Sequence, residues 1–118
     1  MIVDDSRLIR QKIERERDAG VFEVVGTASN GAEALSLFEQ VRPDVITMDL
    51  TMPELDGIEC IQGLVRLDPD VRIVVISALN DKATGLEAVE QGAMGFVTKP
   101  FTGDELKAAL REIVEAVD

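Results

Sequence analysis

The sequence predicts an α/β fold, in which helices cover both faces of a parallel sheet of five strands. Two observations support this prediction. Short β-branched apolar segments alternate with amphipathic segments of helical periodicity along the whole chain. The strand segments are apolar without strict alternation, which is typical of strands that are covered on both faces. Repeated strand–helix units also favour right-handed crossovers, and therefore a doubly wound sheet with five helices.

A doubly wound sheet of this size favours the flavodoxin-like strand order 2-1-3-4-5. The whole chain, residues 1–118, is expected to be one domain, because its length fits one domain and no linker or repeat interrupts it. The predicted strands are, in chain order, Met1–Val3, Phe22–Ala28, Val45–Met48, Val71–Ile76 and Gly95–Thr98.

The first predicted strand is short, with three residues before Asp4 against a usual length of about five or six. In the expected order it is an interior strand, so we hypothesise that the sequence starts inside the strand that related chains build. Apolar residues added ahead of Met1 should then raise the thermal midpoint of unfolding. An unchanged midpoint would contradict the hypothesis.

The first predicted helix has an incomplete apolar face. Its apolar positions Leu8, Ile9 and Ile13 are followed by Glu16 and Arg17, where another apolar turn is expected. The second half of this helix should therefore contribute little to the core and should fray.

Three later segments have apolar residues at helical spacing. Thr102 and Glu105 form a capping-box pattern that opens the last of them. The pairs Asn30-Gly31, Asp56-Gly57 and Gln91-Gly92 mark further helix ends. The three apolar faces are Ala34, Leu35, Phe38 and Val41; Ile58, Ile61, Leu64 and Val65; and Leu106, Leu110, Ile113 and Val117.

The composition excludes several classes of function. A net charge of −11 argues against nucleic acid or an anionic membrane as a partner. The absence of histidine excludes the usual zinc sites, Ser-His and Cys-His catalysis and a phosphohistidine relay within the chain. The single cysteine, Cys60, fits a reducing compartment and is expected to be a small buried apolar residue. Without a long apolar segment or signal peptide, a cytoplasmic location is expected.

Polar residues follow the predicted strands where ligands bind in open parallel sheets, at the carboxyl ends. Asp4 and Asp5 follow the first strand and Asp49 follows the third, which should be its neighbour. Ser77 follows the fourth strand and Lys99 follows the fifth. Each residue alone is a common turn residue, helix cap or solvated charge. Together they predict three converging carboxylates that a hydroxyl and an ammonium approach from the other side.

Such a cluster predicts phosphoryl transfer. Three neighbouring carboxylates repel one another and need a cation, and oxygen ligands favour Mg²⁺ with waters and a substrate phosphate. Lys99 adds a positive charge suited to phosphate. An aspartate carboxylate can itself be the nucleophile and form an acyl phosphate. The sequence therefore predicts transfer onto Asp49, with positioning and charge neutralisation as the main catalytic contributions.

Four motifs resemble the receiver domains of bacterial two-component systems, most closely single-domain regulators of the chemotaxis type. They are Ile-Val-Asp-Asp-Ser (Ile2–Ser6), Met-Asp-Leu-Thr-Met-Pro-Glu-Leu-Asp-Gly (Met48–Gly57), Ile-Ser-Ala (Ile76–Ala78) and Thr-Lys-Pro-Phe (Thr98–Phe101). The resemblance covers essentially the whole chain. It implies a phosphoacceptor that is not a classical enzyme but catalyses its own Mg²⁺-dependent phosphorylation and dephosphorylation.

The resemblance also implies a metal site. Asp49 would be the phosphorylation site and a Mg²⁺ ligand. Asp5 would bind the ion directly and Asp4 largely through water. Thr51 would contribute its backbone carbonyl.

By the same resemblance, Ser77 would hydrogen-bond a phosphoryl oxygen, with the backbone amide of Ala78 close by. Lys99 would pair with another oxygen, and the bond to Pro100 would be cis. Phe96 would swing inward when Ser77 is drawn toward the phosphoryl group, although Phe96 as ordinary strand core remains an alternative. Many relatives have Tyr at this place, and Phe lacks the hydroxyl.

Phosphorylation would then switch a partner surface made of Asp81–Gln91, the last strand and the last helix, that is, helix 4, strand 5 and helix 5. The implied partners are a sensor histidine kinase and an unknown output protein. No nucleic acid or membrane contact is expected within this chain. Leu79 lies near the presumed water path to Asp49, so Leu79→Glu should speed loss of the phosphoryl group. An unchanged or longer phosphoryl lifetime would count against this role.

The sequence leaves three alternatives. A flavin-binding electron carrier could share the fold, but the chain has no Trp, no Tyr and no Gly-rich loop after the first strand. A pseudo-receiver would keep the fold as a binding module without phosphorylation. The chain could also be a receiver fragment of a longer response regulator.

Overall fold

A computed structural model describes residues 1–50, 57–77 and 82–115, with the backbone alone for residues 82–85. Strands and helices alternate throughout these residues. The strands are β1 Ile2–Val3, β2 Thr27–Ala28, β3 Val45–Met48, β4 Arg72–Ser77 and β5 Gly95–Thr98. The helices are α1 Arg7–Glu16, α2 Gly31–Val41, α3 Gly57–Leu67, α4 Lys82–Glu90 and α5 Gly103–Glu115.

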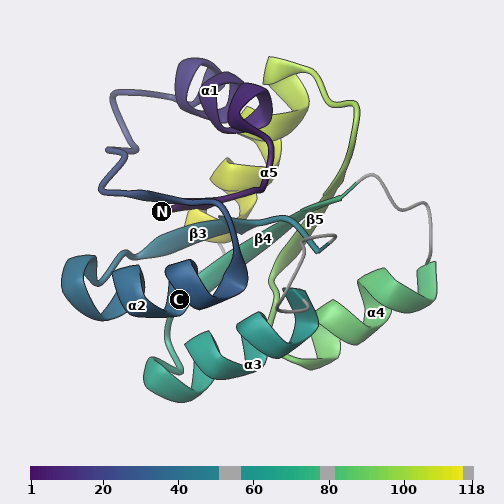
Figure 1. The fold of residues 1–118 in the computed structure, drawn as a ribbon. Coiled ribbons are helices and arrows are strands. Elements are labelled where there is room, and N and C mark those ends of the chain that lie inside the picture. Colours follow the sequence, from purple (N-terminus) through teal and green to yellow (C-terminus); the bar gives the residue numbers. More distant parts are fainter. Residues whose placement is uncertain (51–56, 78–81, 116–118) are drawn as a thin grey trace.

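The strands form one parallel sheet in the order β2-β1-β3-β4-β5, which confirms the predicted order. Figure 1 shows α1 and α5 on one face of the sheet and α2, α3 and α4 on the other. The chain therefore forms the doubly wound α/β sheet with five helices that the alternating pattern predicted.

The core has two parts, one on each face of the sheet. Phe38 and Leu64 belong to the part beneath α2 and α3, and Leu106 and Ile113 belong to the part beneath α5. Strand β4 contributes to both, because its successive side chains point to opposite faces. Ile73 and Val75 pack in the first part, and Val74 and Ile76 pack in the second. This two-sided burial explains why the central strands are apolar without alternation.

The prediction for the second strand is wrong over residues 22–26. We expected a strand over Phe22–Ala28, but the ladder contains only Thr27–Ala28. A strand extends only as far as it has a partner, and β2 pairs with the two residues of β1. Val25 is exposed, so the β propensity of this segment was not enough to place it in the sheet.

Helix α1 differs in part from its prediction. It remains helical to Glu16, where the amide of Arg17 still donates to the carbonyl of Ile13, so the expected fraying does not occur over these residues. The expectation of a small core contribution is confirmed, because Ile13 is the buried residue of this helix. Ser6 caps its first turn by accepting a hydrogen bond from the amide of Ile9 at 3.3 Å.

The predicted caps and faces of the later helices are largely confirmed. Thr102 Oγ1 accepts a hydrogen bond from the amide of Glu105, and the Glu105 carboxylate accepts one from the amide of Thr102. Asn30 accepts from the amide of Glu33 at the start of α2. The apolar faces of α2, α3 and α5 are buried or half-buried, whereas Val117 lies outside the described residues.

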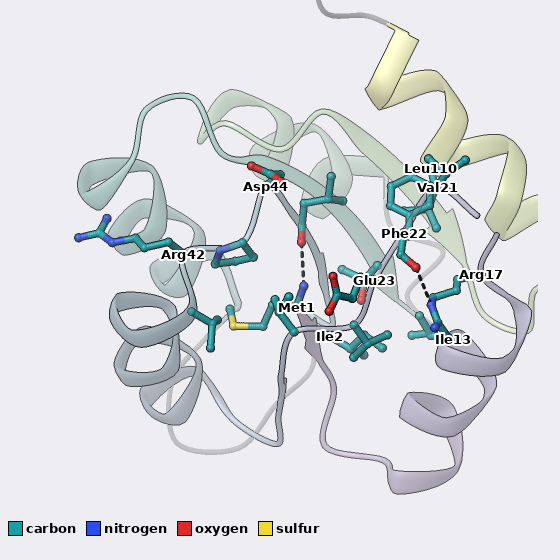
Figure 2. A pocket seen from close by; sticks show the side chains of 16 residues that line it. Met1, Ile2, Ile13, Arg17, Val21, Phe22, Glu23, Arg42, Asp44 and Leu110 are labelled. Atoms are coloured by element: carbon teal, nitrogen blue, oxygen red, sulfur yellow. Dashed lines mark hydrogen bonds between the residues drawn. The ribbon is translucent and has the colours of Figure 1, made fainter. Parts of the chain in front are cut away.

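A cavity of about 310 Å³ lies at the amino ends of β1 and β3. Figure 2 shows the side chains that line it. The Met1 ammonium donates a hydrogen bond to the carbonyl of Val45 at 2.9 Å beside it. Burial lowers the pKa of this amine to about 6, partly opposed by the carboxylate of Asp44. The cavity lies at the edge of the sheet opposite the carboxyl ends, so it forms no part of the predicted site. Among the described helices, none has the length and apolar character needed to cross a membrane.

Candidate functional site

Three carboxylates meet at the carboxyl ends of β1 and β3. The amide of Asp4 bonds to the carbonyl of Ala28 on β2, and the amide of Asp49 bonds to the carbonyl of Val3 on β1. These backbone hydrogen bonds bring Asp4 and Asp49 to the same sheet edge, and Asp5 follows directly. One ligand oxygen from each of the three residues lies within 4.8 Å of the other two. Asp4 and Asp49 are buried, whereas Asp5 is exposed.

The two carboxylate oxygens of Asp4 have different surroundings. Oδ1 accepts a hydrogen bond from the amide of Ser6 at 2.9 Å, which fixes the side chain against the start of α1. Oδ2 is buried and accepts no hydrogen bond from the described residues. The Nζ atom of Lys99 lies 2.8 Å from Oδ2, so this contact is an ion pair without hydrogen-bond alignment. Oδ2 therefore keeps capacity for a further ligand.

Lys99 reaches the cluster from the loop between β5 and α5. Its Nζ atom lies 3.5 Å from Oδ2 of Asp49, besides the shorter contact with Asp4. Its backbone amide donates to the carbonyl of Ser77 at 2.8 Å, which ties the end of β5 to the end of β4. The peptide bond between Lys99 and Pro100 is cis, as the resemblance implied.

The donor set fits a hard divalent cation. It consists of carboxylate oxygens, including the buried Oδ2 of Asp4, with no nitrogen or sulfur ligand at the described residues. Among the described residues, three carboxylates face the Lys99 ammonium, so this cluster has an excess of negative charge when the groups are ionised. A divalent cation would balance that excess. Because Asp5 is exposed, such a cation would reach the cluster from solvent on the side of Asp5.

The remaining predicted residues lie around this cluster or outside the described part of the chain. Ser77 is fully buried at the end of β4, next to the backbone of Lys99. Phe96 on β5 is 37% exposed, which contradicts the alternative that it is ordinary strand core. Thr51, Ala78 and Leu79 lie outside the described residues.

Sequence reasoning missed two residues of α1 that hold the backbone of the site. Arg10 Nη1 donates to the carbonyl of Asp4 at 2.7 Å. Lys12 Nζ donates to the carbonyl of Phe101. Lys12 stands three positions after Ile9, which packs against the core, so helical spacing places it at the edge of the apolar face. Its partner, 89 residues away, could not be inferred from spacing.

The sequence matches the family model described as the response regulator receiver domain over residues 1–111. This chain belongs to that family. The four motifs at the strand ends therefore identified the class correctly, and the chain is a receiver domain of the two-component type. The described part of the structure agrees, because its sheet has the strand order that the alternating pattern predicted and its acidic cluster contains the aspartates of the first two motifs.

Individual relatives support the same assignment. The chemotaxis protein CheY of Thermotoga maritima is 37% identical over 113 residues, which span 96% of this chain and 94% of the relative. The response regulator domain of CheB from the same organism has a TM-score of 0.87 and 34% identity, covering 99% of this chain and 95% of that one. A chain of the CheX-CheY-BeF3-Mg²⁺ complex from Borrelia burgdorferi has a TM-score of 0.85 and 30% identity, covering 98% of this chain and 85% of that one.

Proposed function

We propose that Asp49 accepts a phosphoryl group from a partner histidine kinase in a reaction that requires Mg²⁺. The observation that supports this most directly is the cluster itself. Oxygens of Asp4, Asp5 and Asp49 lie within 4.8 Å of one another, and the Lys99 ammonium contacts two of the three residues. Acidic ligands, a nucleophilic carboxylate and a phosphate-binding ammonium are the groups that this reaction needs.

In the proposed reaction, a carboxylate oxygen of Asp49 attacks the phosphorus of the donor. A new O–P bond forms as the P–N bond of the donor phosphohistidine breaks, and the imidazole nitrogen leaves with the electron pair and is then protonated. The product at Asp49 is an acyl phosphate. Bound Mg²⁺ would neutralise phosphoryl charge and orient the donor.

The chain's own residues divide the remaining work. Asp5 and Asp49 are proposed as direct ligands of the ion and Asp4 as a ligand through water, with the carbonyl of Thr51 as a further ligand. Lys99 is proposed to leave Asp4 and pair with a phosphoryl oxygen, because its Nζ atom already lies within 3.5 Å of Asp49 Oδ2.

Ser77 and the amide of Ala78 are proposed to bind the remaining phosphoryl oxygens. Ser77 is suited to this role because it is fully buried at the end of the strand between β3 and β5.

The proposed output is a change in the surface of α4, β5 and α5. Phe96 is 37% exposed on β5, so it starts at the surface, and we propose that it moves inward when Ser77 is drawn toward the phosphoryl group. Other large apolar side chains of this surface are also exposed, and a protein partner would cover them. They are Leu86 and Val89 of α4, and Met94, which directly precedes β5, is also exposed.

Intact-mass spectrometry with a small phosphodonor tests the proposal. The wild-type protein should gain one phosphoryl group only when both the donor and Mg²⁺ are present. Asp49→Asn keeps the shape of the residue but removes the nucleophile, so it should gain none. A wild-type protein that stays unlabelled with donor and Mg²⁺ would instead favour the pseudo-receiver, a binding module without phosphorylation.

A further inference from the structure

A lysine of α1 holds the loop that follows Lys99. The ammonium of Lys12 donates a hydrogen bond to the backbone carbonyl of Phe101 and lies 4.4 Å from the centroid of the Phe101 ring. Phe101 is buried, with 3% of the residue exposed, and Lys12 is half-buried. One side chain therefore binds both the backbone and the ring of the same residue, through a charge-assisted hydrogen bond and a cation–π contact.

This double contact fixes the backbone on the far side of Lys99. On the near side, the amide of Lys99 is bonded to the carbonyl of Ser77 on β4. On the far side, Phe101 stands two residues after Lys99 and is held by Lys12. The side chain of Lys99 thus starts from a short segment that is restrained at both ends.

The same helix restrains the acidic partner of Lys99. Arg10, two positions before Lys12, donates to the backbone carbonyl of Asp4 at 2.7 Å. Both members of the 2.8 Å ion pair between Lys99 and Asp4 are therefore held from α1. Small displacements matter in phosphoryl transfer, because positioning supplies much of its catalysis.

We propose that Lys12 is a positioning residue for phosphoryl transfer, which acts by holding Phe101 so that the ammonium of Lys99 stays beside Asp49, within reach of the phosphoryl group. This inference rests on the proposed function of Asp49. Lys12 has no assigned contact with the phosphoryl group or the metal ion, so its effect is transmitted through Lys99.

Rates of phosphorylation by a small phosphodonor with Mg²⁺ test this role, measured by intact-mass spectrometry. Lys12→Met should slow the reaction about tenfold, because the restraint on the Lys99 loop is lost. Lys12→Arg keeps a cation that can bond the carbonyl and stack on the ring, so it should restore most of the rate. Lys107→Met is the matched control, because it removes the same charge from an exposed position of α5.

A double-mutant cycle distinguishes positioning from a general loss of stability. In a Lys99→Met background, Lys12→Met should cause little further loss of rate, because the residue through which it acts is gone. The Mg²⁺ dissociation constant of Lys12→Met should lie between those of the wild type and Lys99→Met, because a less restrained Lys99 opposes the metal ion less.

The outcomes separate this inference from the proposed function. A wild-type protein that is not labelled at all would overturn the proposed function. A labelled wild type with equal rates in Lys12→Met and Lys107→Met would overturn the positioning role alone. Additive losses in the Lys99→Met background would also overturn it, because Lys12 would then act independently of Lys99.

Discussion

At the scale of single residues, Lys99 supplies part of the positive charge that the acidic cluster needs. Its ammonium contacts the buried Oδ2 of Asp4 at 2.8 Å and Oδ2 of Asp49 at 3.5 Å. A cation in the site must therefore share these carboxylates with Lys99. Since like charges near one another disfavour binding, the ammonium and a metal ion should oppose each other.

Replacing Lys99 should consequently separate metal binding from phosphorylation. Lys99→Met should tighten Mg²⁺ binding by about threefold to tenfold, because a neighbouring positive charge is removed. The same change should slow phosphorylation by a small donor, because the phosphoryl oxygen loses its ammonium partner. Isothermal titration and intact-mass kinetics measure the two effects. Weaker Mg²⁺ binding in this variant would contradict the described role of Lys99.

Cys60 shows how burial controls the chemistry of a single side chain. It is fully buried, as the sequence predicted, and its thiol donates a weak hydrogen bond to the carbonyl of Gly31 at 3.7 Å. Burial raises the pKa of the thiol from 9.0 to about 12. The native thiol therefore keeps its proton at pH values where the unfolded thiol loses it.

This difference predicts a pH dependence of stability. Below a pH of about 9, the thiol is protonated in both the folded and the unfolded state, so it does not change the free energy of unfolding. Between pH values of about 9 and about 12, only the unfolded state loses the proton, so the free energy of unfolding falls as the pH rises. The slope should approach about 1.4 kcal/mol per pH unit. Urea unfolding at several pH values measures it. Cys60→Ala, the control, should lack this slope, and identical pH dependences in the two proteins would refute the expectation.

At the scale of elements, α1 and α5, which cover the same face of the sheet (Figure 1), each hold one part of the site. Helix α1 follows Asp4 and Asp5 and holds the backbone of Asp4 through Arg10. Helix α5 begins just after the loop of Lys99, at the capping box of Thr102 and Glu105. The caps therefore stabilise not only the helices but also the loops that present the charged groups.

The cap of α5 gives a prediction for stability. Thr102→Ala removes the hydroxyl that accepts from the amide of Glu105 at 3.1 Å, so the free energy of unfolding should fall by about 1 kcal/mol. Urea denaturation of the two proteins measures the change. Thr102→Ser keeps the hydroxyl and should lose much less. Equal losses in both variants would show that the methyl group, rather than the cap, matters.

At the scale of the whole molecule, the acidic cluster links metal binding to the stability of the fold. Asp4 and Asp49 are buried at the ends of two central strands, so their mutual repulsion acts against the folded sheet. A cation that binds only the folded arrangement relieves this repulsion and stabilises the fold by mass action.

Saturating Mg²⁺ should therefore raise the thermal midpoint of unfolding. At a concentration near one hundred times the dissociation constant, the gain should be about 2.7 kcal/mol. Differential scanning calorimetry with and without Mg²⁺ measures it, with equal ionic strength kept by Na⁺. Asp49→Asn should raise the midpoint in the absence of metal and reduce the response to Mg²⁺. An equal response in the variant would place the metal ion elsewhere.

The sequence by itself determined the fold class, most helix faces and caps, and the residues of the acidic cluster, and it favoured the strand order that the sheet has. These inferences succeed because they depend on local spacing, on chain direction and on motifs at strand ends. The prediction of a strand over residues 22–26 was wrong, because a strand needs a neighbouring strand to pair with as well as β propensity.

Only the tertiary structure decided which carboxylates are buried and which of them Lys99 contacts. It also decided that Lys12 holds Phe101, 89 residues away in the chain. The physical reason is the same in each case. Burial, ion pairing and contacts between distant segments depend on how the elements pack together, and spacing along the sequence does not contain that information.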